Sequence, residues 1–375
     1  MSSRHAEHVS GIQELGKSLQ GGDFIESPFD IPAEEERRGD PDQVDDDQNF
    51  ADSEAACVAI QKSLPEGKKD IESVSFTPRL TYFLDGSLRT KYLGEYIEGE
   101  RSFPILATEV SCAVVKRNGK ALQTQELRTR LAFVFPHKES GLVSDSLFEK
   151  LSSLNEAWKA ANSTLAIEFL KKDSKGIRDV RYSMQGKARD IMHTLEHEVA
   201  NRLDLRTSWL VMDGAIRKEE FLSLSNTIGL AKSFSRKPTF DIGDGRRRSI
   251  TKYLATIREG ERSAVFKTAL GQKVCFWYVR LRTYPPMEPL GGLVKIDFKF
   301  EPDELTQEVE KLVDEISAEI YASRAPSVYP YPRWPSFIYP IRMAEQVMRT
   351  AFINDELVGF YGNLLGRRVK EIALT

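Results

Sequence analysis

The feature that most constrains the fold is a series of strand-forming runs in the first half of the chain, joined by short turn signals. Three such runs, rich in β-branched and aromatic residues, lie at residues 78–84, 103–116 and 128–135. Asn118-Gly119, between the second and third runs, is a strong signal for a two-residue hairpin. We therefore expect an antiparallel meander, with compact structure beginning near Ile71.

Helical and strand patterns alternate after this meander. The expected helices lie at residues 144–161, 185–203, 302–322 and 341–352, and the expected strands at 208–212, 264–269, 274–282 and 293–300. This order predicts an α/β fold with a mixed sheet flanked by helices. The sequence shows no repeat of fixed period, which excludes a solenoid.

The N-terminal part of the chain is strongly acidic. Residues 22–52 contain three prolines, many Asp and Glu residues and few large apolar side chains. Such a segment buries too little surface to offset its ordering entropy. We expect an acidic, partly flexible region at residues 1–70, with a short helix at 11–19, and one folded domain at 71–375. Two roles stay open for the acidic segment: a solvated linker, or a docking strip that mimics DNA and covers a basic groove.

Composition excludes several protein classes. The 375 residues carry 53 Lys and Arg against 56 Asp and Glu, so the chain outside the acidic segment is net basic. The three cysteines, Cys57, Cys112 and Cys275, lie too far apart for a disulfide scaffold or a Cys-rich zinc module. No apolar run approaches the roughly 20 residues of a membrane span, and no secretory signal is visible. We expect a cytoplasmic protein without a membrane partner.

Two Asp-Gly pairs resemble each other. Asp85 and Asp213 each follow an apolar strand-forming run, and a glycine comes next in both cases. A carboxylate at a rigid strand end suits a hard divalent cation, although Asp-Gly also occurs as ordinary turn chemistry. The following glycine allows either a tight turn or a close backbone approach. If both aspartates serve one site, their strands must be neighbours in one sheet.

The helix expected between these strands carries further candidate ligands. Glu196 and Glu198 flank its apolar face on opposite sides, each roughly 70 to 90° from the centre of that face. Either glutamate can reach a site at the edge of the core, and the alternative is that both are solvated. His193, Glu196 and His197 also match the H-x-x-E-H motif of zinc peptidases. Both histidines fall roughly 130 to 170° from the apolar centre, which argues against a shared zinc.

The order of several motifs resembles a known family. The motifs are Asp85-Gly86-Ser87, Glu196 with Ala200, Asp213-Gly214, Gly229-x-x-Lys232, and Tyr339-Pro340 leading to Ala344-Glu345. Together they resemble the NurA nuclease family, whose fold is RNase H-like, and the resemblance covers the chain from about residue 73 onward. Family members are metal-dependent DNA nucleases activated by Mn²⁺ or Mg²⁺. They commonly form dimers and work with a hexameric HerA-type ATPase in DNA end processing, and some relatives act in antiphage defence.

The resemblance implies roles for individual residues. Asp85, Glu196 and Asp213 would hold the metal, with Glu198 as the substitute for Glu196, and two ions would lie about 4 Å apart. Lys232 would place a positive charge on the scissile phosphate. Glu345 stands where the family usually has histidine, and it would act as a fourth ligand or an orienting base. This departure leaves open a non-catalytic nucleic-acid-binding or scaffold subunit on the same fold.

A basic cluster follows the lysine of this motif set. Its members are Lys232, Arg236, Lys237, Arg246, Arg247, Arg248 and Lys252. A basic loop beside a phosphate-cleaving site is a natural clamp for the DNA backbone, although it also suits a solvated loop. Arg280 and Arg282 alternate with apolar residues and share one strand face, so we expect them to line a DNA channel. The aromatic loop at residues 329–334 suits base stacking, a core plug or a dimer contact.

The leading prediction is therefore a metal-dependent deoxyribonuclease that uses Mn²⁺ or Mg²⁺. Its expected partners are DNA, a second copy of the chain and a HerA-type hexameric ATPase. The non-catalytic scaffold and the zinc peptidase are the competing functions.

Overall fold

The computed structural model describes residues 3–26, 57–61, 67–171, 177–216, 219–234, 239–241, 247–268, 273–283, 288–300, 305–326, 334–353 and 361–366. The helices of four or more residues with defined bounds are α1 (Ser3–Ser18), α4 (Asp145–Ala160), α5 (Ile177–Ala200), α6 (Glu219–Leu222), α7 (Ile250–Leu254), α8 (Gln307–Ala322) and α9 (Tyr339–Ala351). The strands are β1 (Asp23–Glu26), β2 (Cys57–Ala59), β3 (Lys68–Asp70), β4 (Leu80–Glu98), β5 (Arg101–Asn118), β6 (Ala121–Phe135), β7 (Leu165–Phe169), β8 (Trp209–Asp213), β9 (Thr227–Ala231), β10 (Thr239–Asp241), β11 (Arg247–Ser249), β12 (Glu261–Ser263), β13 (Phe266–Thr268), β14 (Val274–Arg280) and β15 (Leu293–Lys299).

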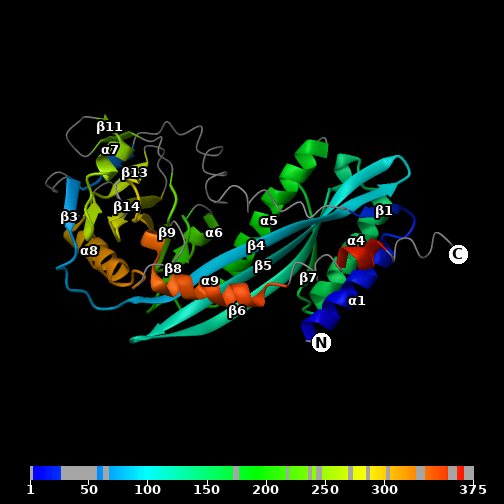
Figure 1. Ribbon diagram of the computed structural model, residues 1–375, viewed down its shortest axis with the longest axis horizontal. Helices are drawn as coiled ribbons and strands as arrows, with labels where there is room; N and C mark the ends of the chain where they lie inside the picture. Colours follow the sequence, from blue (N-terminus) through cyan, green and yellow to red (C-terminus); the bar gives the residue numbers. More distant parts are fainter. Residues whose placement is uncertain are drawn as a thin grey trace.

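In the described part of the chain, the strands form one mixed sheet of 15 strands. Its main path runs β11-β10-β2-β13-β14-β15-β9-β8-β4-β5-β6-β7. The meander β4-β5-β6 is antiparallel, whereas β8 runs parallel to both β4 and β9. Figure 1 shows the three long strands of the meander extending along the molecule, with helices on both sides. The predicted α/β class with a mixed sheet and flanking helices is confirmed.

One prediction about the meander is wrong. We expected the first strand to end at Asp85-Gly86, but β4 continues to Glu98. The reason is the antiparallel neighbour, because Asp85 and Gly86 stay paired with Ala113 and Cys112 of β5. The Asp-Gly pair is therefore not a turn. Only the parallel neighbour β8 stops at this level of the sheet.

The two faces of the meander pack against different helices. Phe83 packs in one cluster with side chains of α8 and α9, whereas the next residue, Leu84, packs with side chains of α5. This alternation is what a pleated strand imposes, since successive side chains point to opposite faces. Helices α9 and α5 therefore cover opposite faces of the same strands. Farther along the meander, α1 and α4 cover the face that α9 covers near Phe83.

The N-terminal helix belongs to the folded structure, contrary to our expectation that compact structure begins near Ile71. Helix α1 buries Ile12 and Leu15 in a cluster with side chains of β5, β6 and α4. Strand β1 pairs with the far end of β4, where Phe24 lies opposite Tyr96. The sequence predicted a helix only at residues 11–19, whereas α1 spans Ser3–Ser18. The acidic residues 27–56 lie outside the described residues, so the roles considered for them stay predictions.

Other element boundaries follow from local chemistry. Helix α8 begins at Gln307 rather than near residue 302, because the Thr306 hydroxyl caps it by accepting the backbone N–H of Val309. In the described residues, no helix is both long enough and apolar enough to cross a membrane.

Candidate metal centre

Two neighbouring strands place Asp85 and Asp213 side by side. Strand β8 runs parallel to β4, and Met212 is the register partner of Leu84. The next residue on each strand is the aspartate, so both carboxylates arise at one level of the sheet. Strand β8 ends at Asp213, and Gly214 follows with φ +95°, a conformation that favours glycine. The predicted adjacency of the two strands is confirmed.

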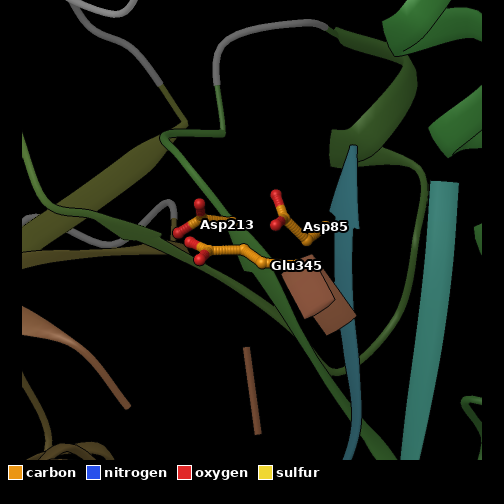
Figure 2. Close-up of side chains that lie close together, drawn as sticks. All are labelled: Asp85, Asp213 and Glu345. Carbon is orange, nitrogen blue, oxygen red and sulfur yellow. The ribbon is translucent and has the colours of Figure 1, made fainter. Parts of the chain in front are cut away.

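Glu345 of α9 brings a third carboxylate to this point. One carboxylate oxygen from each of Asp85, Asp213 and Glu345 lies within 4.8 Å of the others. Figure 2 shows the three side chains reaching one common space from three different elements. Helix α9 is fixed there because Ala344 and Met348 are buried in the core cluster of the sheet. The three residues form the group that we call the carboxylate triad.

Lys232 lies against the triad and follows directly after β9. Its Nζ is 2.8 Å from Asp213 Oδ2 and 3.1 Å from Glu345 Oε1, and its side chain is only 8% exposed. The Phe337 ring lies under the ammonium, 4.7 Å from Nζ to the ring centroid. Burial alone would lower the pKa of Lys232, but the surrounding carboxylates, Asp213 first, raise it above its ordinary value. The ammonium is therefore charged.

A second cation fixes the charge of Glu345. The Arg342 guanidinium, one helical turn earlier on α9, donates to Glu345 Oε2. Burial raises the pKa of Glu345, yet Lys232 and Arg342 together bring that pKa below its usual value. Glu345 is thus held as a carboxylate. Sequence reasoning missed Arg342, although its i, i+3 spacing to Glu345 on one helix is a usable signal.

Asp85 has the opposite electrostatic environment. It is 6% exposed, and burial raises its pKa well above the ordinary value. Repulsion from Asp213 adds to this shift, and Glu345 and Glu196 add further, whereas Lys232 opposes it. Negative charge from neighbouring carboxyl groups thus concentrates at Asp85, although Lys232 and Arg342 both lie against the triad. An oxygen-only donor set of this kind fits Mg²⁺ or Mn²⁺.

Glu196 lies beside the triad without joining it. A Cβ built on Gly86 would lie 2.3 Å from Glu196 Oε1, so the glycine makes room for this carboxylate. Asp85 and Gly86 point to opposite faces of β4, which puts Glu196 on the α5 side of the strand. Its Oε2 lies 2.8 Å from His193 Nδ1, and its exposed fraction is 4%. Glu198 is much more exposed and pairs with Arg130. Of the two glutamates left open, Glu196 is the one near Asp85.

The histidines of the H-x-x-E-H motif do not form a metal site in the described part of the chain. There, the carboxylate triad is the one group of three or more His, Cys, Asp or Glu side chains close enough to share an ion. His193 contacts Glu196, whereas His197 lies near Asn201 and the ring of Phe221. The geometry thus gives the zinc-peptidase alternative no support.

Several residues predicted to contact DNA lie outside the part of the chain that the structure describes. Arg236, Lys237 and Arg246 are outside the described residues. Arg247 and Arg248 belong to β11, but their side chains are not described. The basic clamp therefore stays a prediction.

The structure argues against Arg280 as a residue that lines a DNA channel. Arg280 is 5% exposed, and its guanidinium donates to backbone carbonyls at the C-terminal end of α7 and in the segment that precedes β15. The acceptors are the carbonyls of Leu254, Ile257, Pro289 and Gly291. Arg282 is half-buried, donates to the Ala325 carbonyl and stacks 5.4 Å from the centroid of Trp334. Strand β14 ends at Arg280, so Arg282 follows the strand and the two arginines do not share a strand face as we expected.

Comparison with known proteins gives little further information. No known protein-family model matches the sequence. No curated protein matches it either. Among solved structures, the crystal structure of the NurA nuclease from Sulfolobus solfataricus aligns with a TM-score of 0.42 and 11% sequence identity, covering 88% of this chain and 95% of that chain. This neighbour bears the name of the family that the motifs resemble. A likeness of this size carries no functional argument, so the function rests on the geometry of the triad.

Proposed function

We propose that this protein is a metal-dependent deoxyribonuclease that hydrolyses phosphodiester bonds at the carboxylate triad. The observation that carries the proposal is the convergence of Asp85, Asp213 and Glu345 within 4.8 Å from two strands and a helix. Two Mn²⁺ or Mg²⁺ ions held there would supply an activated water and would offset negative charge on the phosphate. An Asp-Gly turn needs only local backbone geometry, whereas this cluster requires β4, β8 and α9 to be held together.

The chain's own residues have distinct roles in this proposal. Asp85 and Asp213 hold the cation from the sheet, and Glu345 holds it or orients the water from α9. Lys232 lies where its charge can face the scissile phosphate. Glu196 lies on the opposite face of β4 and does not hold the cation itself. Its negative charge helps to raise the pKa of Asp85, and a cation bound at the triad would offset that repulsion.

One observation favours a second candidate, the non-catalytic nucleic-acid-binding or scaffold subunit. Lys232 already bridges Asp213 and Glu345 in the described structure. An ammonium in this position balances part of the acidic charge without any metal. A chain that had lost catalysis would keep such an internal ion pair to hold α9 on the sheet.

The partners are also proposals. The sequence resemblance suggests a homodimer that docks on a hexameric HerA-type ATPase, which would feed DNA to the site. Size-exclusion chromatography with a co-encoded ATPase of this type tests the point. A stable monomer that shows no association would count against both partners.

Cleavage assays separate the two functions. Wild-type protein should cut single- or double-stranded DNA with Mn²⁺ or Mg²⁺ and lose activity in EDTA. Asp85→Asn and Glu345→Gln should each reduce cleavage by about 100-fold or more, the scale of losing one preorganised electrostatic contact. Glu198→Gln is the matched control, because Glu198 lies on α5 outside the triad and should keep activity. Wild-type cleavage by Asp85→Asn would contradict the proposal, and DNA binding without cleavage under every metal would favour the scaffold.

A further inference from the structure

The chain after Asp213 turns tightly across the neighbouring strand. Strand β8 ends at Asp213, and the N–H of Gly214 donates to the Leu230 carbonyl of β9 at 3.0 Å. Ile216, at the end of this turn, is buried in the cluster that contains side chains of α5. Asp213 lies on the other face of the sheet with Val211, which packs in the cluster of α8 and α9. The turn therefore passes from the α9 face of the sheet to the α5 face.

Gly229 of β9 leaves room for this crossing. A Cβ built on Gly229 would lie 2.7 Å from the Gly214 carbonyl oxygen and 2.9 Å from the Ile216 nitrogen. Both distances are much shorter than an ordinary contact between non-bonded atoms, so a side chain here requires the turn to move. The backbone of the turn thus lies directly on β9, and its position depends on what holds Ile216.

Asp297 of β15 holds the end of the turn. It is the register partner of Gly229, so its side chain lies on the same face, beside the crossing backbone. Its Oδ2 accepts the Ile216 N–H at 3.2 Å, and its exposed fraction is 2%. Lys295 Nζ lies 2.9 Å from the other oxygen, Oδ1. One buried carboxylate thus connects the turn behind Asp213 to a central strand of the sheet.

Asp297 is not a further member of the metal centre. In the part of the chain that the structure describes, the group close enough to share an ion is the carboxylate triad alone. Ile296 and Phe298, on either side of Asp297, pack in the cluster of α8 and α9, so Asp297 points to the opposite face. From there it can act on the triad through the backbone of the turn and through its charge.

We propose that Asp297 is a positioning residue: by accepting the Ile216 N–H it fixes the turn that follows Asp213, and so the direction in which the Asp213 carboxylate faces a cation. The inference rests on the proposed function for the cation. Asp213 depends on such support more than Asp85 does, because β8 ends at Asp213 whereas β4 stays paired with β5 beyond Asp85. Replacing residues that orient metal ligands typically weakens metal binding by about 10- to 100-fold.

Two double variants separate the hydrogen bond from the charge. The acceptor-retaining variant, Asp297→Asn with Lys295→Met, keeps an oxygen that can accept from Ile216 and removes both charges of the ion pair. The acceptor-free variant, Asp297→Leu with Lys295→Met, removes the same charges and also the acceptor. Both keep the net charge of the wild type, so long-range electrostatics is the same in the two proteins.

Mn²⁺ affinity is the first readout, measured by electron paramagnetic resonance titration without DNA. The acceptor-retaining variant should bind Mn²⁺ within about twofold of the wild type, and the acceptor-free variant about 10- to 100-fold more weakly. Equal affinities in the two variants would overturn the proposal. Gly229→Ala displaces the same turn by a different route and should also weaken Mn²⁺ binding, which keeps the test decisive if the acceptor-free variant does not fold. Unchanged affinity in Gly229→Ala would count against the turn as the element that matters.

Amide hydrogen exchange in EDTA is the second readout and needs no metal. The acceptor-free variant should exchange the Ile216 amide about 5- to 10-fold faster than the wild type, the scale of one lost hydrogen bond. The acceptor-retaining variant should exchange it at nearly the wild-type rate. Fast exchange in both variants would show that the charge of Asp297, not its hydrogen bond, holds the turn.

Asn155→Leu is the matched control. Asn155 of α4 is buried, and its Oδ1 accepts the Ile167 N–H of β7 at 2.8 Å. The variant therefore loses the same kind of contact, a buried side-chain acceptor for a strand N–H, at an edge of the sheet away from the triad. It should be destabilised without any change in Mn²⁺ affinity. Weaker Mn²⁺ binding in this control would mean that general destabilisation explains the effect, which would overturn the role of Asp297.

The positioning role and the proposed metal centre can fail separately. If the wild type binds no Mn²⁺ but the Ile216 amide exchanges faster only in the acceptor-free variant, the metal centre fails and the positioning of the turn stands. If Asp85→Asn abolishes Mn²⁺ binding while the acceptor-free variant binds the ion normally, the positioning role fails and the metal centre stands.

Discussion

Replacing Gly86 by alanine should destabilise the protein, because the Glu196 side chain occupies the space that a Cβ needs. The new Cβ would lie 2.3 Å from Oε1, 2.7 Å from Cδ and 2.9 Å from Cγ of Glu196. Ordinary contacts between carbon atoms begin near 3.5 Å. Since three successive atoms are too close, rotation of the carboxylate alone does not relieve the contact. Glu196 must adopt another rotamer and leave His193.

The magnitude follows from three contributions. Overpacking a filled site costs about 1 to 3 kcal/mol. The lost contact with His193 costs about 1 kcal/mol more. Replacing a strand glycine by alanine returns about 0.5 to 1 kcal/mol of backbone entropy. We expect a net loss of about 1 to 3 kcal/mol in the free energy of unfolding, and a fall in Tm of about 2 °C for each kcal/mol.

Urea unfolding of five proteins, the wild type and four variants, measures this effect. Gly186→Ala is the control on α5, the helix that carries Glu196, because nothing lies within 4 Å of the position that a Cβ would take there and alanine should stabilise the helix by about 0.5 to 1 kcal/mol. Glu196→Ala removes the three clashing atoms, so Gly86→Ala should cost little in that background. A Gly86→Ala protein as stable as the wild type, or an equal loss with and without Glu196, would refute the reasoning.

Three further predictions concern buried charges. Lys232→Met should lower the free energy of unfolding by about 3 to 5 kcal/mol in EDTA, because it removes the buried cation that bridges Asp213 and Glu345, and by less in Mn²⁺ if the triad binds the ion; an equal loss in both would contradict this. Burial lowers the pKa of His8 from 6.5 to about 4, so the unfolded chain binds more protons between these values. Stability should therefore fall as pH drops from about 6.5 to 4, by up to about 3 kcal/mol, and His8→Gln should flatten that dependence in urea titrations. Arg280→Met should lower the free energy of unfolding by at least about 3 kcal/mol and leave the salt dependence of DNA binding unchanged. A weaker salt dependence in this variant would show that Arg280 contacts DNA.

The sequence predicted the two central aspartates because their signal is local. Each apolar run ends in Asp-Gly, and parallel strands bring such ends to one level of the sheet. The length of β4 was not predictable in the same way. Asp85-Gly86-Ser87 has the composition of a turn, but pairing with Ala113 and Cys112 of β5 keeps it extended. A partner residue nearly 30 positions away decides the outcome, and no short-range pattern contains it.

Burial of polar residues was equally hard to predict. Strand alternation gives the face of Arg280 but not the loop carbonyls that cover it. The helix pattern placed Glu196 at the edge of the apolar face without showing that it would pack against Gly86. Helix α1 was partly missed because its burial depends on distant β5, β6 and α4. In each case the missing information is a long-range contact.

The most direct test of the account is to locate a metal ion. Crystals soaked in Mn²⁺ and measured at a wavelength where manganese scatters anomalously would show where the ion binds. The account predicts an anomalous peak about 2.1 Å from oxygens of Asp85, Asp213 and Glu345, the distance typical of a small hard cation. A map with no peak at the triad, while Lys232 still bridges Asp213 and Glu345, would contradict the central claim, and so would a peak on His193 and His197 instead.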